Sequence, residues 1–195
     1  ISRASRLMKR IGILGDIGSG KSYVAKNFGF PVFNADEEVS KIYKKEIKIF
    51  FKLKKSLPKY IKSFPINKYE ISKAILANNI NLKKIIKIVH SEVRKKMISF
   101  LKKNKSKKII ILDIPLLLEN KINRQSDILV FVKSNRILIN RELKKRENFN
   151  SKLYKKFKNI QLSLAYKKKK AQFVIKNDFK QKTVKREISK ILNKI

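Results

Sequence analysis

The segment GDIGSGKS, residues 15–22, has the residue types and spacing of a loop that binds nucleotide phosphates. Its glycines let successive backbone N–H groups point at a phosphate chain, which a Cβ atom would obstruct. Lys21 supplies a positive charge for the β and γ phosphates, and the hydroxyl of Ser22 can ligate Mg²⁺. The chain has only five glycines in 195 residues, and four of them lie between positions 12 and 20. We therefore predict a nucleotide-binding loop here and not an ordinary turn that contains a lysine.

Two aspartates follow apolar segments and have the chemistry for phosphoryl transfer. Asp36 comes after the short apolar segment 31–33, where its carboxylate could take the proton of an attacking hydroxyl. It could equally cap the helix that begins beside it. Asp113 ends the apolar segment 109–112, which is the position from which a carboxylate holds Mg²⁺ directly or through water. The alternative for Asp113 is a turn that simply ends the strand.

Arginine is scarce among the basic residues, so its positions carry information. We expect Arg141 and Arg146 to lie on one basic helix of a lid that places guanidinium groups on the transferred phosphoryl group. The alternative is a solvated basic helix, which is how we also interpret the lysine run 167–170. His90 is the only histidine and lies in a helical segment, where a structural hydrogen-bonding role is the plainer interpretation.

Alternating strand and helix patterns position these residues. A short apolar strand precedes the glycine loop, and a helical pattern follows it. Residues from about 37 to 107 have helical spacing, broken only by Pro58 and Pro65. Strands that alternate with helices predict an α/β fold with a parallel sheet, right-handed crossovers and the long helical stretch as an insertion. The expected strands are 10–14, a short one from Pro31, 109–112, 127–132 and 173–177.

Composition excludes several classes of protein. A hydrophobic fraction of 43% argues against wholesale disorder, and no stretch approaches the roughly 18 uninterrupted apolar residues of a membrane span. The absence of cysteine excludes disulfides and thiolate metal sites and fits a cytoplasmic protein. The net charge of +37 is spread over every segment, which favours a codon bias over a dedicated nucleic-acid surface. We expect residues 1–7, which precede Met8, to be a leader or an added remnant.

Taken together, the motifs resemble those of the dephospho-CoA kinase family over nearly the whole chain from Met8. The loop alone is shared by many NTPases, but the segment LDIPLLLE with an Ala-Asp pair and an H-x-x-x-R helix is far more specific. The residues that carry the resemblance are GDIGSGKS at 15–22, Ala35-Asp36, His90 to Arg94, LDIPLLLE at 112–119, Arg146, Gln161 and VIKN ending at Asn177.

The resemblance implies an α/β, P-loop nucleotide-kinase-like fold with a parallel five-stranded sheet, a helical substrate-binding insertion and a lid. It implies a single kinase domain over 8–195, with a core at 8–36 and 107–195, a helical CoA-binding subdomain at about 37–106 and a lid at about 141–165. The implied reaction is transfer of the γ-phosphoryl group of ATP to the ribose 3′-hydroxyl of dephospho-CoA, with ATP and Mg²⁺ as cofactors. We expect no specific nucleic acid and no membrane as partners, and a monomer or weak homo-oligomer.

Site residues follow by position. The resemblance implies catalysis by Asp36, Lys21 and Arg146, and substrate binding by Asp36, His90 and Arg94. Our interpretation of the loop and of the strand end gives Ser22 and Asp113 as metal ligands. The residues expected to bind ATP are Gly18, Ser19, Gly20, Lys21, Ser22 and Tyr23.

Several positions depart from the family pattern. Ser91 replaces the usual Pro, and Lys68 and Gln172 stand where the family often has Arg and Asp. Asp16 replaces a usual Gly, and Tyr23 a common Thr. These departures concern recognition of the CoA side more than the reaction. Two alternative functions stay open: another P-loop nucleoside or nucleotide kinase, and a basic P-loop NTPase that binds nucleic acid.

Overall fold

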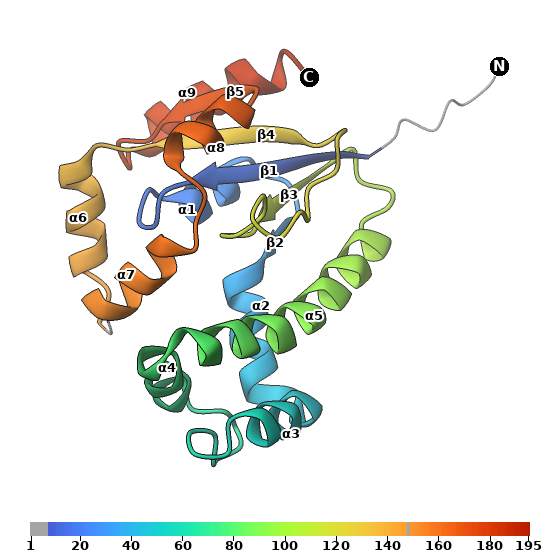
Figure 1. The fold of residues 1–195 in the computed structure, drawn as a ribbon. Coiled ribbons are helices and arrows are strands. Elements are labelled where there is room, and N and C mark those ends of the chain that lie inside the picture. The colour runs from blue at the N-terminus through green and yellow to red at the C-terminus, as the bar shows by residue number, and fades with distance from the viewer. Residues whose placement is uncertain (1–7, 148) are drawn as a thin grey trace. The chain divides into compact units, whose positions relative to one another are not determined.

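The computed structural model describes residues 8–147 and 149–195, and five parallel strands of this part of the chain form one sheet. Their order across the sheet is β2-β3-β1-β4-β5 (Figure 1). The predicted α/β class with a five-stranded parallel sheet is confirmed, whereas the prediction for residues 1–7 lies outside the described residues. The strands are β1 (Lys9–Gly15), β2 (Val32–Asn34), β3 (Ile109–Asp113), β4 (Ile128–Lys133) and β5 (Phe173–Lys176).

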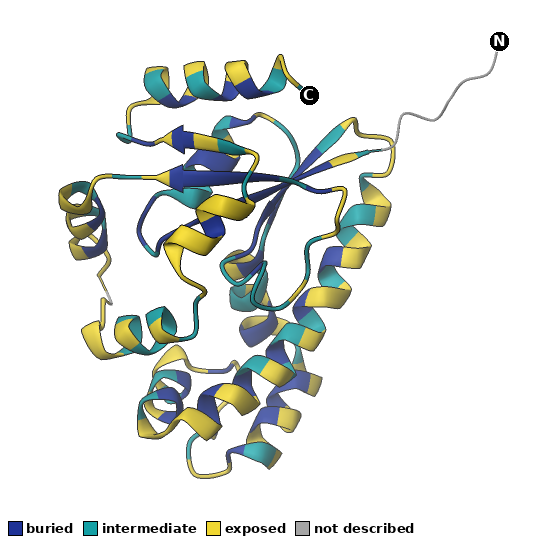
Figure 2. Cartoon of the chain, turned by 45° about the horizontal axis from the view of Figure 1, so that its top comes forward, coloured by how far each residue is buried: buried dark blue, intermediate teal, exposed yellow. Residues whose placement is uncertain are grey.

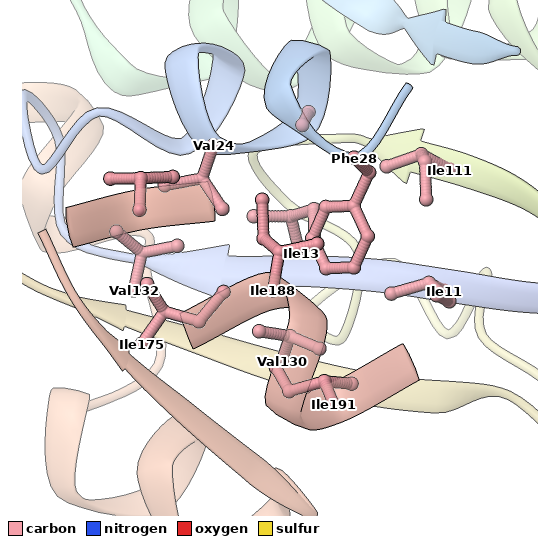
Figure 3. Close-up of a cluster of buried hydrophobic side chains, with 12 residues drawn as sticks. Ile11, Ile13, Val24, Phe28, Ile111, Val130, Val132, Ile175, Ile188 and Ile191 are labelled. Carbon is pink, nitrogen blue, oxygen red and sulfur yellow. The ribbon is translucent and has the colours of Figure 1, made fainter. Parts of the chain in front are cut away.

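The middle parts of the central strands are apolar because both faces of the sheet are covered, although β1 begins with Lys9 and the buried Arg10. On one face, Ile11 and Ile13 of β1 are fully buried against α1 (Lys21–Asn27) and α9 (Gln181–Leu192), as Figure 3 shows. Side chains alternate along a strand, so the residue between them, Gly12, faces the other side, where a Cβ would meet Leu117. The short helix α8 (Leu164–Lys170) packs on β1 and β4 there (Figure 1).

The strand register gathers polar residues at one edge of the sheet. Parallel pairing places Asn34 of β2 opposite Asp113 of β3, and Gly15 of β1 opposite Val132 of β4. The carboxyl ends of these strands therefore meet at the edge where open α/β sheets bind their ligands.

The chain divides into two compact units, and the first contains the sheet with α1, α6 (Arg136–Lys144), α8 and α9. The second comprises Ala35–Lys103 and Asn150–Asn159 and is entirely helical in its regular structure. The helical spacing predicted from about 37 to 107 is largely confirmed, and the segment with Pro58 and Pro65 is not helical. The helices of the second unit are α2 (Ala35–Lys45), α3 (Ile47–Ser56), α4 (Lys68–Ala77), α5 (Asn79–Lys103) and α7 (Ser151–Asn159).

The core of the helical unit forms along α5. Its apolar residues recur every three or four positions, so Leu82, Ile85 and Val89 share one buried face, and Figure 2 shows the alternation of buried and exposed residues along this helix. The helix α7 packs on α4, and Lys156 Nζ lies 3.0 Å from Asn79 Oδ1. None of the helices in the described ranges combines the length and apolar character needed to cross a membrane.

Candidate active site

The loop 15–22 joins the end of β1 to the start of α1, so the predicted strand, loop and helix are present. Gly18 and Gly20 have φ angles of 82° and 85°, a left-handed backbone that glycine adopts without strain. Packing also requires glycine at position 18, because a Cβ there would lie 2.9 Å from Cγ of Leu143. The loop therefore depends on glycine for its conformation and for its contact with α6.

Lys21 lies over the carbonyl groups of its own loop. Its Nζ donates to the carbonyl of Asp16 at 2.7 Å and lies 3.4 Å from the carbonyl of Gly15. Carbonyl oxygens hold the ammonium group where oxygens of a bound phosphate can replace them. This arrangement suits a lysine that neutralises phosphate charge.

The side-chain amide of Asn34 connects the two residues expected to bind metal. Its Nδ2 donates to Oδ2 of Asp113 at 2.7 Å and to Oγ of Ser22 at 3.5 Å. Asp113 is only 3% exposed, so the amide also orients a buried carboxylate.

This donor set fits a magnesium ion that shares its coordination with a nucleotide. Mg²⁺ prefers oxygen ligands and is commonly held by one or two carboxylates together with substrate phosphates and water. In the described ranges no group of three or more His, Cys, Asp or Glu residues could hold a metal alone. A hydroxyl and one carboxylate, as in Ser22 and Asp113, match the shared mode of binding.

Helix α6 packs against the loop through Leu143 and Ile139, which both approach Gly18. The helix was predicted to extend to Arg146, but this prediction is wrong, because α6 ends at Lys144 and Arg146 lies in the exposed turn that follows. The N–H of Arg146 donates to the carbonyl of Leu143 at 3.2 Å, a tightened last turn that ends the helix. Arg141 remains on α6 and is exposed.

Sequence reasoning gave no role to three polar residues at this edge: Asn34, Ser134 and Asn177. Asn177 appeared only as part of the resemblance. Each ends or closely follows an apolar strand, and that position is the signal by which they could have been found. Ser134 and Asn177 both contact the carbonyl of Ser19 in the loop.

The remaining predicted site residues belong to the helical unit. Asp36 lies in the first turn of α2, two residues after Asn34 in the chain, and is exposed. His90 and Arg94 are four residues apart on α5, so they share one side of that helix. His90 is half-buried and Arg94 is exposed. The sheet unit thus brings together the loop, Asn34 and Asp113, whereas these three residues belong to the other unit.

One departure from the family pattern has a structural explanation. Gln172 pairs with Leu129 at the start of β4, where its Oε1 accepts the Leu129 N–H at 2.6 Å. Its own N–H donates to the carbonyl of Leu129 at 3.0 Å. This glutamine therefore fixes the entry to β5 against β4.

The lysine run 167–170 is only partly a solvated face. The side chain of Lys167 is 1% exposed, and its Nζ lies 2.7 Å from Oε1 of Glu119, the last residue of LDIPLLLE. The same ammonium donates to Oε1 of Gln161 at 3.0 Å. The interpretation of the run as solvated is therefore wrong for Lys167, because this position of α8 points at a buried carboxylate.

A cavity of ≈ 280 Å³ adjoins the loop within the sheet unit. This volume is near the lower end of small-molecule pockets. The cavity gives the loop a concave surface beside it. It is lined by Asp16, Ser19, Phe131, Val132, Lys133, Ser134, Arg136, Ile139, Leu164, Ala165 and Lys168.

Comparison with known proteins decides the family. The family model described as dephospho-CoA kinase matches residues 9–183, which is most of the chain. The chain belongs to the dephospho-CoA kinase family. A curated dephospho-CoA kinase from Wolbachia pipientis wMel is 32% identical over 190 residues, which cover 95% of this chain and 97% of that protein.

Solved structures agree with this family at the level of the fold. TT1252 from Thermus thermophilus superposes with a TM-score of 0.78 at 24% identity and covers 97% of this chain and 98% of its own. A dephospho-CoA kinase from Campylobacter jejuni gives a TM-score of 0.62 at 20% identity, with 96% and 97% covered. The kinase fold predicted from the motifs is therefore confirmed.

Proposed function

We propose that this member of the dephospho-CoA kinase family transfers the γ-phosphoryl group of ATP to the ribose 3′-hydroxyl of dephospho-CoA, giving coenzyme A and ADP. One observation carries the proposal beyond the family match: the phosphate loop lies beside the hydrogen-bonded set of Ser22, Asn34 and Asp113. A phosphate cradle, a cation and oxygen ligands for a metal are the parts that phosphoryl transfer needs.

On the nucleotide side, the backbone N–H groups of the loop from Gly18 to Tyr23 bind the phosphates of ATP. Lys21 leaves the loop carbonyls and binds the β and γ phosphates. Ser22 and Asp113 would hold Mg²⁺, which would neutralise charge on these phosphates, and Asn34 keeps the carboxylate in place.

The reaction is an in-line displacement at phosphorus. The 3′-oxygen of the acceptor forms a bond to the γ-phosphorus while the bond from this phosphorus to the β–γ bridging oxygen breaks, and ADP leaves with that electron pair. The hydroxyl proton passes to the carboxylate of Asp36. Arg146 donates to the oxygens of the transferred group, so that positioning and charge neutralisation supply most of the catalysis.

On the acceptor side, we assign dephospho-CoA binding to the helical subdomain at about 37–106, with contacts from His90 and Arg94. The lid at about 141–165 closes over the nucleotide. The helical subdomain and the lid belong to one kinase domain over 8–195. The guanidinium group of Arg94 on α5 suits binding to the phosphates of the acceptor, because it is exposed and always charged.

We place the enzyme in the cytoplasm, as a monomer or weak homo-oligomer without a specific nucleic-acid or membrane partner. The absence of cysteine from the sequence supports this placement. The even spread of basic residues supports the statement on nucleic acid.

The test is an acceptor assay with the purified full chain, ATP and Mg²⁺. We expect dephospho-CoA to be converted to coenzyme A with stoichiometric ADP. Robust turnover of a nucleoside monophosphate and none of dephospho-CoA would move the assignment to a nucleotide kinase. ATP hydrolysis that requires DNA or RNA, with steeply salt-dependent binding, would instead indicate a nucleic-acid-dependent NTPase.

A further inference from the structure

Asn177 contacts the phosphate loop from the end of β5, far away in the sequence. The residue is 3% exposed, and both ends of its side-chain amide are used. Nδ2 donates to the carbonyl of Ser19 at 2.9 Å, and Oδ1 accepts the N–H of Phe179 at 2.9 Å. One side chain therefore holds the loop and the turn after β5 together.

Ser134, the residue after β4, contacts the same carbonyl. Its Oγ lies 2.8 Å from the carbonyl oxygen of Ser19 and 3.0 Å from that of Asn177. The Ser19 carbonyl is thus approached by an amide and a hydroxyl from the ends of two neighbouring strands. The single hydroxyl hydrogen of Ser134 serves one of these two carbonyls at a time, so the amide of Asn177 is the main restraint on rotation of the Ser19 carbonyl.

The direction of this carbonyl determines the direction of the next N–H. A trans peptide is planar, so its C=O and N–H groups point to opposite sides. With the Ser19 oxygen held toward Asn177 and Ser134, the N–H of Gly20 points away from both of them. In a loop of this sequence that N–H is one of the donors to phosphate.

The neighbouring backbone is fitted closely around Asn177. A Cβ on Gly20 would collide with Nδ2 of Asn177 and would lie 2.7 Å from Cε1 of Phe179. Phe179 itself has a φ of 62°, which is uncommon for a residue with a side chain. Such backbone persists where its surroundings hold it, and here Asn177 holds the N–H of Phe179.

We propose that Asn177, assisted by Ser134, is a positioning residue for nucleotide binding. It fixes the Ser19–Gly20 peptide so that the Gly20 N–H faces the phosphates of ATP, and it couples the loop to the turn that carries Phe179. The acceptor is not part of this arrangement, so loss of Asn177 weakens ATP binding selectively.

The neighbouring Asp178 provides a matched control. Its Oδ1 accepts the N–H of Lys180 at 2.9 Å, and its Oδ2 accepts the hydroxyl of Thr183 at 2.9 Å. Asp178→Ala therefore disturbs the same turn without removing a contact to the loop.

The experiment measures ATP and dephospho-CoA binding separately by calorimetry on the full chain, with thermal unfolding recorded for every variant. We expect Asn177→Ala to raise the Kd for ATP roughly tenfold, equivalent to about 1.4 kcal/mol. Asn177→Asp raises it further, because a carboxylate then faces the Ser19 carbonyl. Both leave the Kd for dephospho-CoA within about twofold, and Asp178→Ala leaves both values within about twofold, which corresponds to less than about 0.5 kcal/mol.

An equal loss of ATP affinity in Asp178→Ala, or a parallel loss of both ligands in Asn177→Ala, would overturn the proposal. If Asn177 variants do not fold, Ser134→Ala removes a single hydroxyl, and we expect a Kd for ATP raised at least about twofold; an unchanged value contradicts the proposal. ATP binding is measured without acceptor, so the result stands apart from the proposed function. A wild-type chain that binds ATP but not dephospho-CoA contradicts only that function.

Discussion

Asn34 and Asp113 are register partners at the ends of β2 and β3, and the amide of Asn34 donates to the carboxylate of Asp113 at 2.7 Å. The same amide reaches the hydroxyl of Ser22 at the start of α1. A short parallel pairing thus connects the phosphate loop to the carboxylate of the neighbouring strand. The consequence is that Asn34 sets the geometry of both proposed metal ligands.

Removing this amide should weaken the use of magnesium. For Asn34→Ala we expect the Mg²⁺ concentration at half-maximal activity to rise about 10- to 100-fold, as for other residues that orient metal ligands. Asn27→Ala is the control, because the amide of Asn27 donates within α1, to the carbonyl of Tyr23 at 2.9 Å. An unchanged Mg²⁺ dependence in Asn34→Ala would show that the amide has no part in metal binding.

Asp36→Asn tests the proposed base with almost no change in shape. We expect turnover to fall at least about 100-fold, since general bases contribute roughly 10²- to 10⁴-fold, while the Kd for ATP stays near the wild-type value. Glu37→Gln, the next residue in the same exposed first turn of α2, should retain activity. If Asp36→Asn turns over normally, the carboxylate serves only the start of the helix.

Much of this site could be predicted because its signals are local. The loop has a fixed spacing of glycines, lysine and serine, and Asp113 directly ends an apolar strand, so the sequence alone indicates phosphate and metal chemistry. Each of the five strands likewise contains a short apolar run, a signal that lies within the segment itself.

What could not be predicted depends on contacts distant in sequence. Asn177 and Ser19 are 158 positions apart, and no local sequence pattern predicts their hydrogen bond. Lys167 is one of four consecutive lysines, and composition does not tell which of them turns toward Glu119. The end of α6 before Arg146 is set by hydrogen bonds of the last turn, which helical spacing does not reveal.

Two glycines allow the contact between the loop and α6 to be tested. Gly18→Ala places a Cβ 2.9 Å from Leu143 and pushes α6 away from the loop, and we expect turnover to fall by as much as about 100-fold through misplacement of Arg146. Gly29→Ala has a similar positive φ of 74° but nothing within 4 Å of its Cβ, so it carries the backbone strain alone. Equal activity of the two variants would rule out the collision as the cause.

The buried ion pair of Lys167 and Glu119 should matter for stability because removing one partner leaves the other charge buried and unpaired. Oε1 of Glu119 also accepts the N–H of Leu162 at 2.9 Å, so the carboxylate fixes the chain just before α8. Lys167→Met leaves this carboxylate buried without its cation, and we expect the free energy of unfolding in urea to fall by about 3 to 5 kcal/mol. Adding Glu119→Gln to Lys167→Met should restore part of the lost free energy of unfolding. A Lys167→Met variant as stable as the wild type would contradict this account.

Acidification should weaken the start of α9 through Asp178. The N–H of Lys180 and the hydroxyl of Thr183 bind the charged carboxylate, and they hold the pKa of Asp178 below its ordinary value of 3.8. A lowered folded-state pKa contributes stability that is present above pH 3.8 and is lost as the pH falls through the folded-state value. Asp178→Asn lacks this titration, so its melting temperature should fall less than that of the wild type between pH 5 and pH 2. Parallel melting curves for the two proteins over this range would mean that the carboxylate titrates alike in the folded and unfolded chain.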